Sequence, residues 1–327
     1  MAIMVTGSAG FIGYHVSHAL LARGERVIGV DDLNAYYDPA LKQARLARLE
    51  ADRRFTSARL DVADLAALRA LARRHRNEIT GVIHLAAQAG VRHSLTAPFD
   101  YVHSNLEGHM VILEVCRHDL PKLEHLVYAS SSSVYGGNTK IPFAIEDRVD
   151  RPVSLYAATK RANELMSHCY AHLYAIPQTG LRFFTVYGPW GRPDMAAWLF
   201  CDAIVRGRPI TLNNHGDMER DFTYIDDIAA GVLAALDRPP GAAGDAPHAL
   251  YNLGNHRPVH LRRFLGILEA ALGRKAEVKL APLPPGDVVR TCADIAASRR
   301  DLGFEPKTPI EDGLPRFVAW YREYHGV

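Results

Sequence analysis

The chain has 327 residues, 48% of them hydrophobic and 23% charged, which suits one large α/β unit or a large domain with a smaller lobe and excludes a disordered chain. Its 38 basic and 36 acidic residues are well mixed and leave a net charge of +2, so nothing favours nucleic acid or a membrane surface as a partner. The sequence has no membrane-spanning apolar run and no metal-ligand pattern among its four cysteines, so we expect a cytoplasmic protein without a metal.

A short strand, a glycine turn and a helix open the chain. Residues 2–6 form an apolar strand, residues 11–23 have helical periodicity, and residues 26–30 read as a second strand, which completes a βαβ unit. Glycines in such a turn let the backbone approach a pyrophosphate, and the helix N-terminus favours its charge. The pattern predicts a dinucleotide-binding turn, with a turn that holds no ligand as the alternative; its residues are Gly7, Gly10, Phe11, Ile12 and Gly13.

An acidic residue ends the second predicted strand. Asp31 stands 18 residues after Gly13, where a carboxylate accepts hydrogen bonds from the adenosine ribose and repels a 2′-phosphate. This favours NAD over NADP, and Asn34 is an alternate for the same contact. Asp61 and Val62 follow the third strand, where they are expected to flank the adenine; the alternative for Asp61 is a helix cap.

Strands and helices alternate through the first half of the chain. Further strands are predicted at 55–60, 81–85, 125–130 and 178–184, with helices at 64–75, 99–118 and 155–175, which indicates a parallel sheet covered on both faces. The later elements, a helix at 224–237, a strand at 250–253 and a helix at 310–325, are more irregularly spaced. We therefore expect a nucleotide-binding domain over 1–184 and a smaller lobe over 185–327, with segments near 221–256 returning to the first.

A tyrosine and a lysine four residues apart carry the strongest chemical signal. Tyr156 and Lys160 share a face of the predicted helix, so the ammonium can favour ionisation of the phenol, whose unperturbed pKa is about 10. Such pairs also occur on solvated helices. Here the pair follows a run of four serines, Ser130 to Ser133, that leads into Val134-Tyr135-Gly136.

These motifs, with Leu85-Ala86-Ala87-Gln88-Ala89 between them, resemble in kind and order the extended short-chain dehydrogenase/reductase family. The closest resemblance within it is to the UDP-glucuronate 4-epimerases, through residues 31–39, 88–92 and 182–195, although His93 stands where those enzymes commonly carry Tyr. The resemblance implies a Rossmann-type, doubly wound parallel sheet with a smaller, interleaved C-terminal lobe for a UDP-sugar. It also implies bound NAD and a homodimer formed by the helices at 99–118 and 155–175.

The resemblance implies a catalytic trio of Tyr156, Lys160 and Ser131. Tyr156 would take the proton from the sugar 4-hydroxyl while hydride leaves C4 for the nicotinamide, and Ser131 would relay that proton and hold the developing carbonyl oxygen. The keto sugar then turns, and hydride returns to its other face. Further cofactor contacts are expected from Leu85, Ala86, Ala87 and Asn105, of which Asn105 has a helix cap as its alternative.

The expected substrate contacts centre on an acidic sugar. Ser132 and Thr185 are assigned to the carboxylate, and Arg92 and Arg192 to the anionic substrate, with ordinary ion pairs as their alternative. Related dehydratases place an Asp-Glu pair, and decarboxylases a Glu, where this chain has Ser132-Ser133. The diphosphate and uridine contacts are expected from Arg220, Asp287 and Arg290.

The expected reaction is interconversion of UDP-glucuronate and UDP-galacturonate by transient oxidation at C4. A 4-epimerase of UDP-glucose and UDP-galactose and a UDP-glucuronate decarboxylase remain the alternative enzymes. A non-catalytic NAD-sensing regulator fits poorly, because Ser131, Tyr156 and Lys160 are all present.

Overall fold

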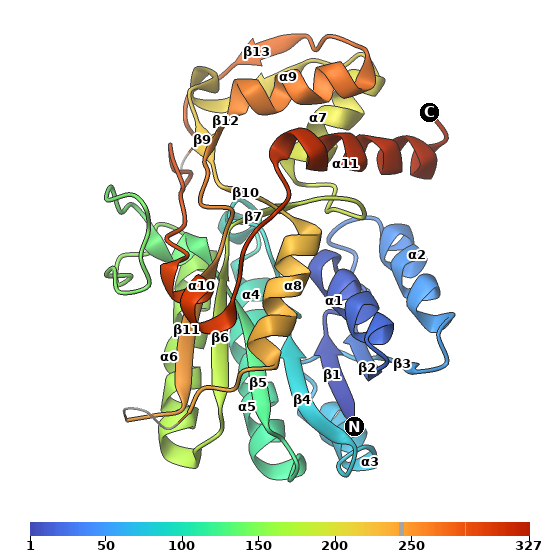
Figure 1. Cartoon of the computed structure of the whole chain (residues 1–327), viewed down its shortest axis with the longest axis vertical. Coiled ribbons are helices and arrows are strands. Elements are labelled where there is room, and N and C mark those ends of the chain that lie inside the picture. Colours follow the sequence, from blue (N-terminus) through green and yellow to red (C-terminus); the bar gives the residue numbers. More distant parts are fainter. Residues whose placement is uncertain (242–244, 285) are drawn as a thin grey trace.

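A seven-stranded parallel sheet forms the centre of the molecule, whose computed structural model describes residues 1–241, 245–284 and 286–327 (Figure 1). The strand order is β11-β6-β5-β4-β1-β2-β3. The chain winds outward from β1 in both directions, so the predicted doubly wound, Rossmann-type sheet is confirmed. The strands are β1 Ala2–Thr6, β2 Arg26–Asp31, β3 Phe55–Arg59, β4 Ile79–His84, β5 His125–Ser131, β6 Gln178–Phe183 and β11 His248–Leu253.

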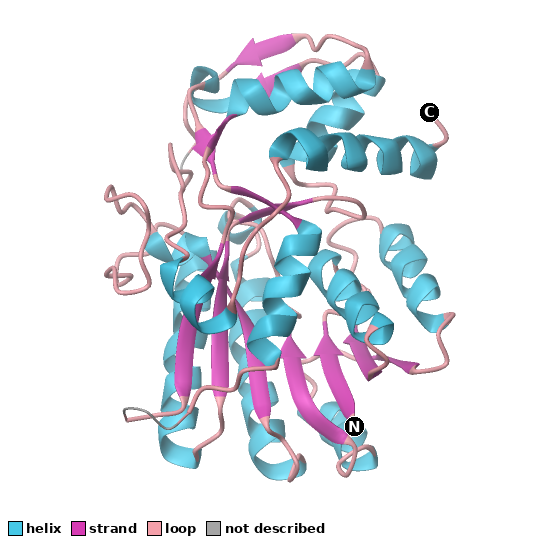
Figure 2. Ribbon diagram, viewed as in Figure 1, coloured by secondary structure: helices cyan, strands magenta, loops and turns pink. Residues whose placement is uncertain are grey.

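Helices cover both faces of the sheet (Figure 2). On one face α1 packs against α8, and on the other α3 packs against α5, which in turn contacts α6. Because both faces are covered, β1 is buried along its whole length and reads as an unbroken apolar run. The helices are α1 Phe11–Ala22, α2 Pro39–Glu50, α3 Leu65–Arg74, α4 Pro98–Tyr101, α5 Gly108–Asp119, α6 Leu155–Tyr174, α8 Ile225–Leu236 and α10 Ala296–Leu302.

A smaller lobe sits over the carboxyl ends of the strands (Figure 1). Its helices α7, α9 and α11 pack on one another, and three short strand pairs, β7 with β10, β9 with β12 and β8 with β13, lie within it. The apolar core continues from the α1 face of the sheet into this lobe, so the two parts share one hydrophobic cluster. The lobe contains β7 Thr185–Tyr187, α7 Ala196–Val205, β8 Ile210–Leu212, β9 Glu219–Arg220, β10 Phe222–Tyr224, β12 Val259–His260, α9 Leu261–Leu272, β13 Val278–Leu280 and α11 Ile310–His325.

The predicted helix at 99–118 is wrong as one continuous α-helix. The structure has α4, then a π-helical stretch Val102–Glu107, then α5. The wider turn brings Asn105 to the interior, where it is 1% exposed, and Gly108 lies so close to Val62 that an added Cβ would be 2.9 Å from its side chain. Tertiary packing against the sheet therefore decides the local winding.

Helix α2 was missed by the sequence analysis, although its start carries a recognisable signal. Asp38 accepts a hydrogen bond from the backbone of Ala40 at 2.9 Å, and Pro39 occupies the first helical position. The helix escapes periodicity analysis because its buried face contains the charged residues Lys42 and Arg45.

Candidate active site

The glycine turn lies where the chain passes from β1 to α1, and sterics require its glycines. Gly7 has φ +71°, and a Cβ there would stand 2.8 Å from the Ala86 nitrogen. A Cβ on Gly13 would be 2.0 Å from the Gly7 carbonyl oxygen, so α1 can pack on the turn only if residue 13 is glycine. Gly10 donates to the same carbonyl at 2.9 Å, and Phe11 and Ile12 begin α1. The turn leaves the backbone cradle that a dinucleotide pyrophosphate requires.

Asp31 is buried at the end of β2 and holds the backbone of the turn. Its Oδ2 accepts from the Ala9 nitrogen at 3.0 Å and its Oδ1 from the Leu33 nitrogen at 2.9 Å. Burial raises the pKa of this carboxyl, and the two backbone donors and Lys42 oppose that rise. The position agrees with a ribose contact, and these protein donors leave it further lone pairs for ribose hydroxyls.

Asn34 is engaged by Lys42, a residue that the sequence analysis missed. The Lys42 ammonium donates to the Asn34 side-chain oxygen at 2.8 Å and to its backbone carbonyl at 2.9 Å. Burial lowers the pKa of Lys42, and the charges of Asp31 and Asp32 oppose this. The β2–α2 loop is therefore fixed from α2, next to the expected ribose site.

Asp61 and Val62 lie on the loop between β3 and α3. Asp61 contacts the His103 Nε2 at 2.8 Å and accepts from the Ala63 nitrogen at 2.9 Å. The alternative role of Asp61 as the cap of the next helix is wrong, because Asp64 caps α3 by accepting from the Ala67 nitrogen at 3.0 Å.

Asn105 fixes the loop after β4, which contains Leu85, Ala86 and Ala87. Its side chain accepts from the Gln88 nitrogen at 2.8 Å and donates to the Gln88 carbonyl at 3.1 Å. It also donates to the Thr159 hydroxyl of α6 at 3.0 Å. The helix-cap alternative is thus replaced by a bridge from the π-helix to the loop and to the helix of Tyr156.

Ser131, Tyr156 and Lys160 come together at the carboxyl end of β5. Ser131 ends the strand, where its hydroxyl accepts from the Ser133 nitrogen at 3.1 Å, and Tyr156 lies in the first turn of α6. The buried Lys160 ammonium donates to the Ala129 carbonyl of β5 at 2.9 Å. The helix and the strand therefore bring the three side chains into one site.

The electrostatics of Tyr156 differ from the expectation. Burial raises the pKa of the phenol, and the opposing influences are the Ser131 hydroxyl and the charge of Arg192. Lys160 is directed to Ala129 instead, and burial lowers its pKa to about 8. In this structure the charge of Arg192 favours the Tyr156 phenolate, and the effect expected of Lys160 on that pKa stays a prediction.

A buried ion pair joins β6 to α6, the helix that carries Tyr156 and Lys160. Arg182 of β6 binds Glu164 of α6 through Nε at 2.8 Å, and both side chains are 1% exposed. Glu164 also accepts from the Ser130 hydroxyl at 2.6 Å, and Arg182 donates to the Tyr135 hydroxyl at 3.0 Å. The network holds Ser130 and Tyr135, which lie on either side of Ser131 in the chain. Its hydrogen bonds are buried and therefore strong.

Arg192 and Thr185 line a small cavity that reaches Phe11 at the start of α1. Arg192 is held side-on by Asp194, with contacts of 2.9 and 2.6 Å, and Asp194 also accepts from the Tyr36 hydroxyl at 3.0 Å. Ser132, the other expected carboxylate ligand, begins the short 3-10 helix Ser132–Tyr135 that directly follows β5.

The other three arginines form ion pairs. Arg92 lies 3.6 Å from Asp287 and is 65% exposed, and Arg220 contacts Asp287 at 2.6 Å, so the structure brings these three together. Arg290 pairs instead with Glu219 at 2.6 Å. The ion-pair alternative for Arg92 describes this structure, and Arg192, which lines the small cavity, pairs with Asp194.

His84 and the acidic start of α8 have structural roles. His84 is buried, contacts the Thr6 hydroxyl at 2.7 Å, and has its pKa lowered by burial to about 3. Asp227 accepts from the Lys307 and Thr308 nitrogens, each at 3.0 Å, and so fixes the segment before α11.

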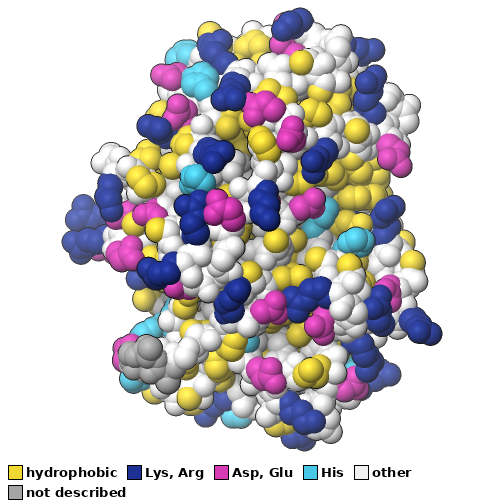
Figure 3. All heavy atoms as spheres, in the orientation of Figure 1, with side chains coloured by type: hydrophobic (Ala, Val, Ile, Leu, Met, Phe, Trp, Pro, Cys, Tyr) yellow, Lys and Arg dark blue, Asp and Glu magenta, His cyan; other side chains and the backbone are white. Residues whose placement is uncertain are grey.

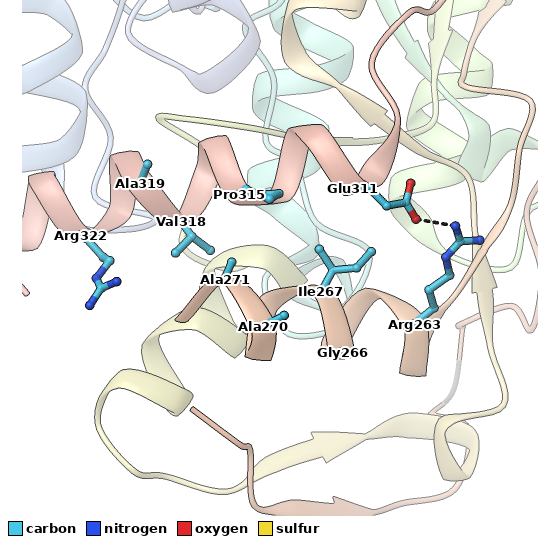
Figure 4. Close-up of a pocket in the computed structure, with 10 residues that line it drawn as sticks. All are labelled: Arg263, Gly266, Ile267, Ala270, Ala271, Glu311, Pro315, Val318, Ala319 and Arg322. Carbon is cyan, nitrogen blue, oxygen red and sulfur yellow. Dashed lines mark hydrogen bonds and ion pairs between the residues drawn. The ribbon is translucent and has the colours of Figure 1, made fainter. Parts of the chain in front are cut away.

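A larger cavity of about 700 Å³ lies between α9 and α11, away from all of these residues (Figure 4). Its walls are mostly apolar, and Arg263 and Glu311 form an ion pair at one end. Positive and negative side chains are interspersed on the face that Figure 3 shows. Within 1–241, 245–284 and 286–327, no helix is long and apolar enough to cross a membrane, and no cluster of metal-ligating side chains is found.

Comparison with known proteins relates this chain to sugar-nucleotide enzymes. The sequence pattern of the NAD-dependent epimerase/dehydratase family matches residues 3–254. UDP-glucuronate 4-epimerase 4 of Arabidopsis thaliana is 48% identical over 334 residues, which cover 99% of this chain and 76% of that protein.

Two solved structures share the fold over nearly the whole chain. UDP-glucuronic acid 4-epimerase from Bacillus cereus, in complex with UDP-glucuronic acid and NAD, has a TM-score of 0.89 and 34% identity, and covers 99% of this chain and 100% of its own. UDP-glucose 4-epimerase from Thermotoga maritima, with UDP-glucose, has a TM-score of 0.88 and 28% identity over 99% and 100%.

Proposed function

The chain belongs to the NAD-dependent epimerase/dehydratase family, and from this membership we propose that it is an NAD-dependent 4-epimerase that interconverts UDP-glucuronate and UDP-galacturonate. The observation that carries the proposal is the position of Arg192, which lines the same small cavity as Thr185 and whose charge opposes the rise in the pKa of the Tyr156 phenol. A guanidinium there suits a sugar that carries a carboxylate next to its reacting carbon. The relatives named for UDP-glucuronate support the same substrate.

Tyr156 is proposed to hold the proton of the sugar 4-hydroxyl during oxidation. Ser131, whose hydroxyl interacts with that phenol, would donate to the oxygen that becomes the carbonyl. When bound, NAD supplies the hydride acceptor and a positive charge near the phenol. Lys160 is proposed to hold the backbone of β5 through Ala129, and Asn105 to hold the loop after β4 through Gln88.

The carboxylate of the substrate needs to be held during this step, because oxidation at C4 makes a β-keto acid that can lose carbon dioxide. Thr185 and Ser132 are proposed to donate hydrogen bonds to it. Arg192 uses Nε and Nη2 to bind Asp194, and within the described residues its Nη1 group makes no hydrogen bond. Hydroxyl and guanidinium donors solvate the carboxylate, which disfavours decarboxylation. A glutamate next to Ser131 would instead repel it.

A neutral UDP-hexose is the second candidate substrate, favoured by the likeness to UDP-glucose 4-epimerase. Arg220 and Asp287 are proposed to serve the nucleotide part in either case. Arg290, held by Glu219, contributes only if that ion pair opens. A homodimer through the helical segments 99–118 and 155–175 stays a prediction; Phe99, Leu165 and Leu173 of these segments are exposed by 83%, 55% and 59%.

Incubation of the purified protein with UDP-glucuronate, without added cofactor, tests the function. We expect UDP-galacturonate as the product by NMR, and NAD on extraction of the denatured protein, because a cofactor regenerated in each turnover can stay bound. Tyr156→Phe should bind the substrate and abolish its conversion. A UDP-pentose would indicate a decarboxylase, and turnover of UDP-glucose alone would reject the acidic substrate; NADP in the extract would contradict the role of Asp31.

A further inference from the structure

Arg45 and Arg182 are the largest fully buried side chains of the described residues, and Arg45 is the one that lies next to the glycine turn. It lies in α2, is 0% exposed, and directs all five N–H groups of its guanidinium to oxygen atoms. Those oxygens are carbonyls and one hydroxyl, so within the described part of the chain no carboxylate contacts it directly. A buried cation without a paired anion is costly, and a complete set of acceptors is what makes it tolerable.

The acceptors of Arg45 belong to three segments that are distant in sequence. Nη1 donates to the Ala9 carbonyl of the glycine turn at 3.0 Å and to the Tyr37 hydroxyl at 2.8 Å. Nε and Nη2 donate to the Trp190 carbonyl at 3.1 and 2.6 Å, and Nη2 donates to the Gly191 carbonyl at 3.1 Å. The turn that faces the cofactor and the loop that leads into Arg192 therefore meet on one side chain.

The loop before Arg192 needs such support because its backbone is strained. Trp190 has φ +61°, a left-handed conformation that costs a non-glycine residue about 1 kcal/mol or more and persists only where the surroundings enforce it. Arg45 donates two hydrogen bonds to the carbonyl of this residue. From α1, the ring of His15 contacts the Pro189 carbonyl at 2.9 Å, and burial lowers the pKa of His15 to about 4, so the ring is the neutral donor.

The turn is fixed from both sides at Ala9. Its nitrogen donates to Asp31, the expected ribose ligand, and its carbonyl accepts from Arg45. Asp31 is the carboxylate whose charge acts on Arg45, so the expected ribose ligand, the turn and the guanidinium form one connected unit.

We propose that Arg45 is a positioning residue that couples the cofactor site to the substrate site, because it fastens the dinucleotide turn and the Trp190–Arg192 loop to each other. Two effects follow. Without the guanidinium the turn loses a support and binds NAD less tightly, and Arg192 loses its fixed place beside Tyr156. A lysine cannot replace it, since one ammonium has no planar fork with which to reach three segments. The second effect rests on the proposed function, and the first does not.

The first experiment measures cofactor binding in Arg45→Met, Arg45→Lys and the control Arg48→Met. Arg48 lies one turn further along α2, is exposed, and donates to the Tyr14 hydroxyl at 3.1 Å. Its guanidinium also lies 5.3 Å from the centre of the Trp190 ring, but it has no hydrogen bond to the glycine turn or to the Trp190 backbone within the described residues, so it controls for the loss of an arginine from this helix. We expect both Arg45 variants to bind NAD about tenfold more weakly by calorimetry, or about 1.4 kcal/mol. Arg48→Met should bind it as the wild type does.

The second experiment separates positioning from general destabilisation. At saturating NAD, we measure KM for UDP-glucuronate and the inhibition constant of UDP-glucose as a competitor. Misplacement of Arg192 should raise KM for UDP-glucuronate at least about fivefold relative to the inhibition constant of UDP-glucose. A merely structural defect should change both constants by the same factor. Circular dichroism establishes which variants are folded; if Arg45→Met is not, Arg45→Lys carries both tests.

Three outcomes overturn the proposal: folded Arg45 variants with wild-type NAD affinity, an unchanged ratio of the two substrate constants, or equal effects in Arg48→Met. If the wild-type protein does not convert UDP-glucuronate, the proposed function fails. The NAD affinities of the same variants then decide the role of Arg45 alone.

Discussion

At the residue scale, the charges around Tyr156 are arranged differently from what a four-residue spacing suggests. Tyr156 and Lys160 do share the face of α6 that meets β5, as the periodicity predicts. The ammonium nevertheless takes the Ala129 carbonyl as its partner, and the guanidinium that acts on the phenol comes from residue 192. Spacing therefore identifies which side chains can meet, while their actual partners depend on strands and loops elsewhere in the chain.

Lys160 is expected to cost the fold stability. Its pKa is lowered by burial from 10.5 to about 8. A fall of that size corresponds to roughly 3 kcal/mol of folding free energy at neutral pH. Lys160→Met removes this cost. It also leaves the Ala129 carbonyl without its donor, and this loss destabilises the protein by about 1 kcal/mol. We therefore expect the variant to be catalytically defective but more stable, with a free energy of unfolding in urea that is higher by on the order of 1–2 kcal/mol.

The pH dependence of this effect follows from the same pKa. A lysine with a depressed pKa in the folded state destabilises the protein fully below that pKa, and the cost disappears as pH rises from about 8 towards the unfolded value of 10.5. The advantage of Lys160→Met should accordingly shrink between about pH 7 and about pH 9.5. The exposed Lys122→Met serves as the control and should stay within about 0.5 kcal/mol of the wild type at both. A destabilised Lys160→Met at neutral pH would contradict this account.

At the element scale, the meeting of β1, the glycine turn and α1 was predictable because every part of it is local in sequence. Strand, turn and helix begin and end within a residue of their predicted positions. Helix α2 was not, because its buried stripe contains Lys42 and Arg45, whose burial is possible only with acceptors from the β2–α2 loop, the turn and residues 190 and 191. No periodicity in hydrophobicity can reveal such a stripe.

Two helical glycines give a matched test of this element. Gly13 in α1 has no room for a Cβ, whereas nothing lies within 4 Å of a Cβ on Gly266 in α9. Gly13→Ala should push α1 off the turn, lower the melting temperature and release NAD. Gly266→Ala should keep NAD and raise stability by about 0.5–1 kcal/mol, since alanine favours a helix. Calorimetric scans and the NAD content of the two proteins distinguish these effects; equal behaviour would refute a steric requirement at Gly13.

At the scale of the whole molecule, one buried carboxylate joins the lobe to the sheet. Asp221, 0% exposed between β9 and β10, accepts from the backbone nitrogens of Asn255, His256 and Ala293 at 2.6, 3.0 and 2.8 Å. It thereby connects the junction of β9 and β10 in the lobe to the chain after β11 and to the segment before α10. Burial raises the pKa of Asp221, and these three donors oppose the rise.

Asp221→Asn should therefore loosen the junction of the two parts. The amide keeps the shape but turns one acceptor oxygen into a donor that faces backbone N–H groups, at a cost of about 2–4 kcal/mol. Asp226→Asn, an exposed change in the first turn of α8, should cost no more than about 0.5 kcal/mol. Urea unfolding of the two variants at about pH 7, with NAD present, measures the difference. Equal stabilities would show that Asp221 does not hold the junction.

The sequence by itself determined the parts that depend on local periodicity and on ordered motifs. These are the parallel sheet, the glycine turn, the acidic end of β2, and the Ser131, Tyr156 and Lys160 trio, and the family membership is confirmed by comparison. The tertiary structure alone decided the partners of the charged groups. Arg192 pairs with Asp194 and its charge acts on the pKa of Tyr156, Arg92 and Arg220 pair with Asp287, Arg290 pairs with Glu219, and Arg45 lies between the turn and the lobe. The physical reason is that a charge in a crevice takes its partner from whichever segment the fold brings within about 4 Å, and that proximity is not encoded in the neighbouring residues.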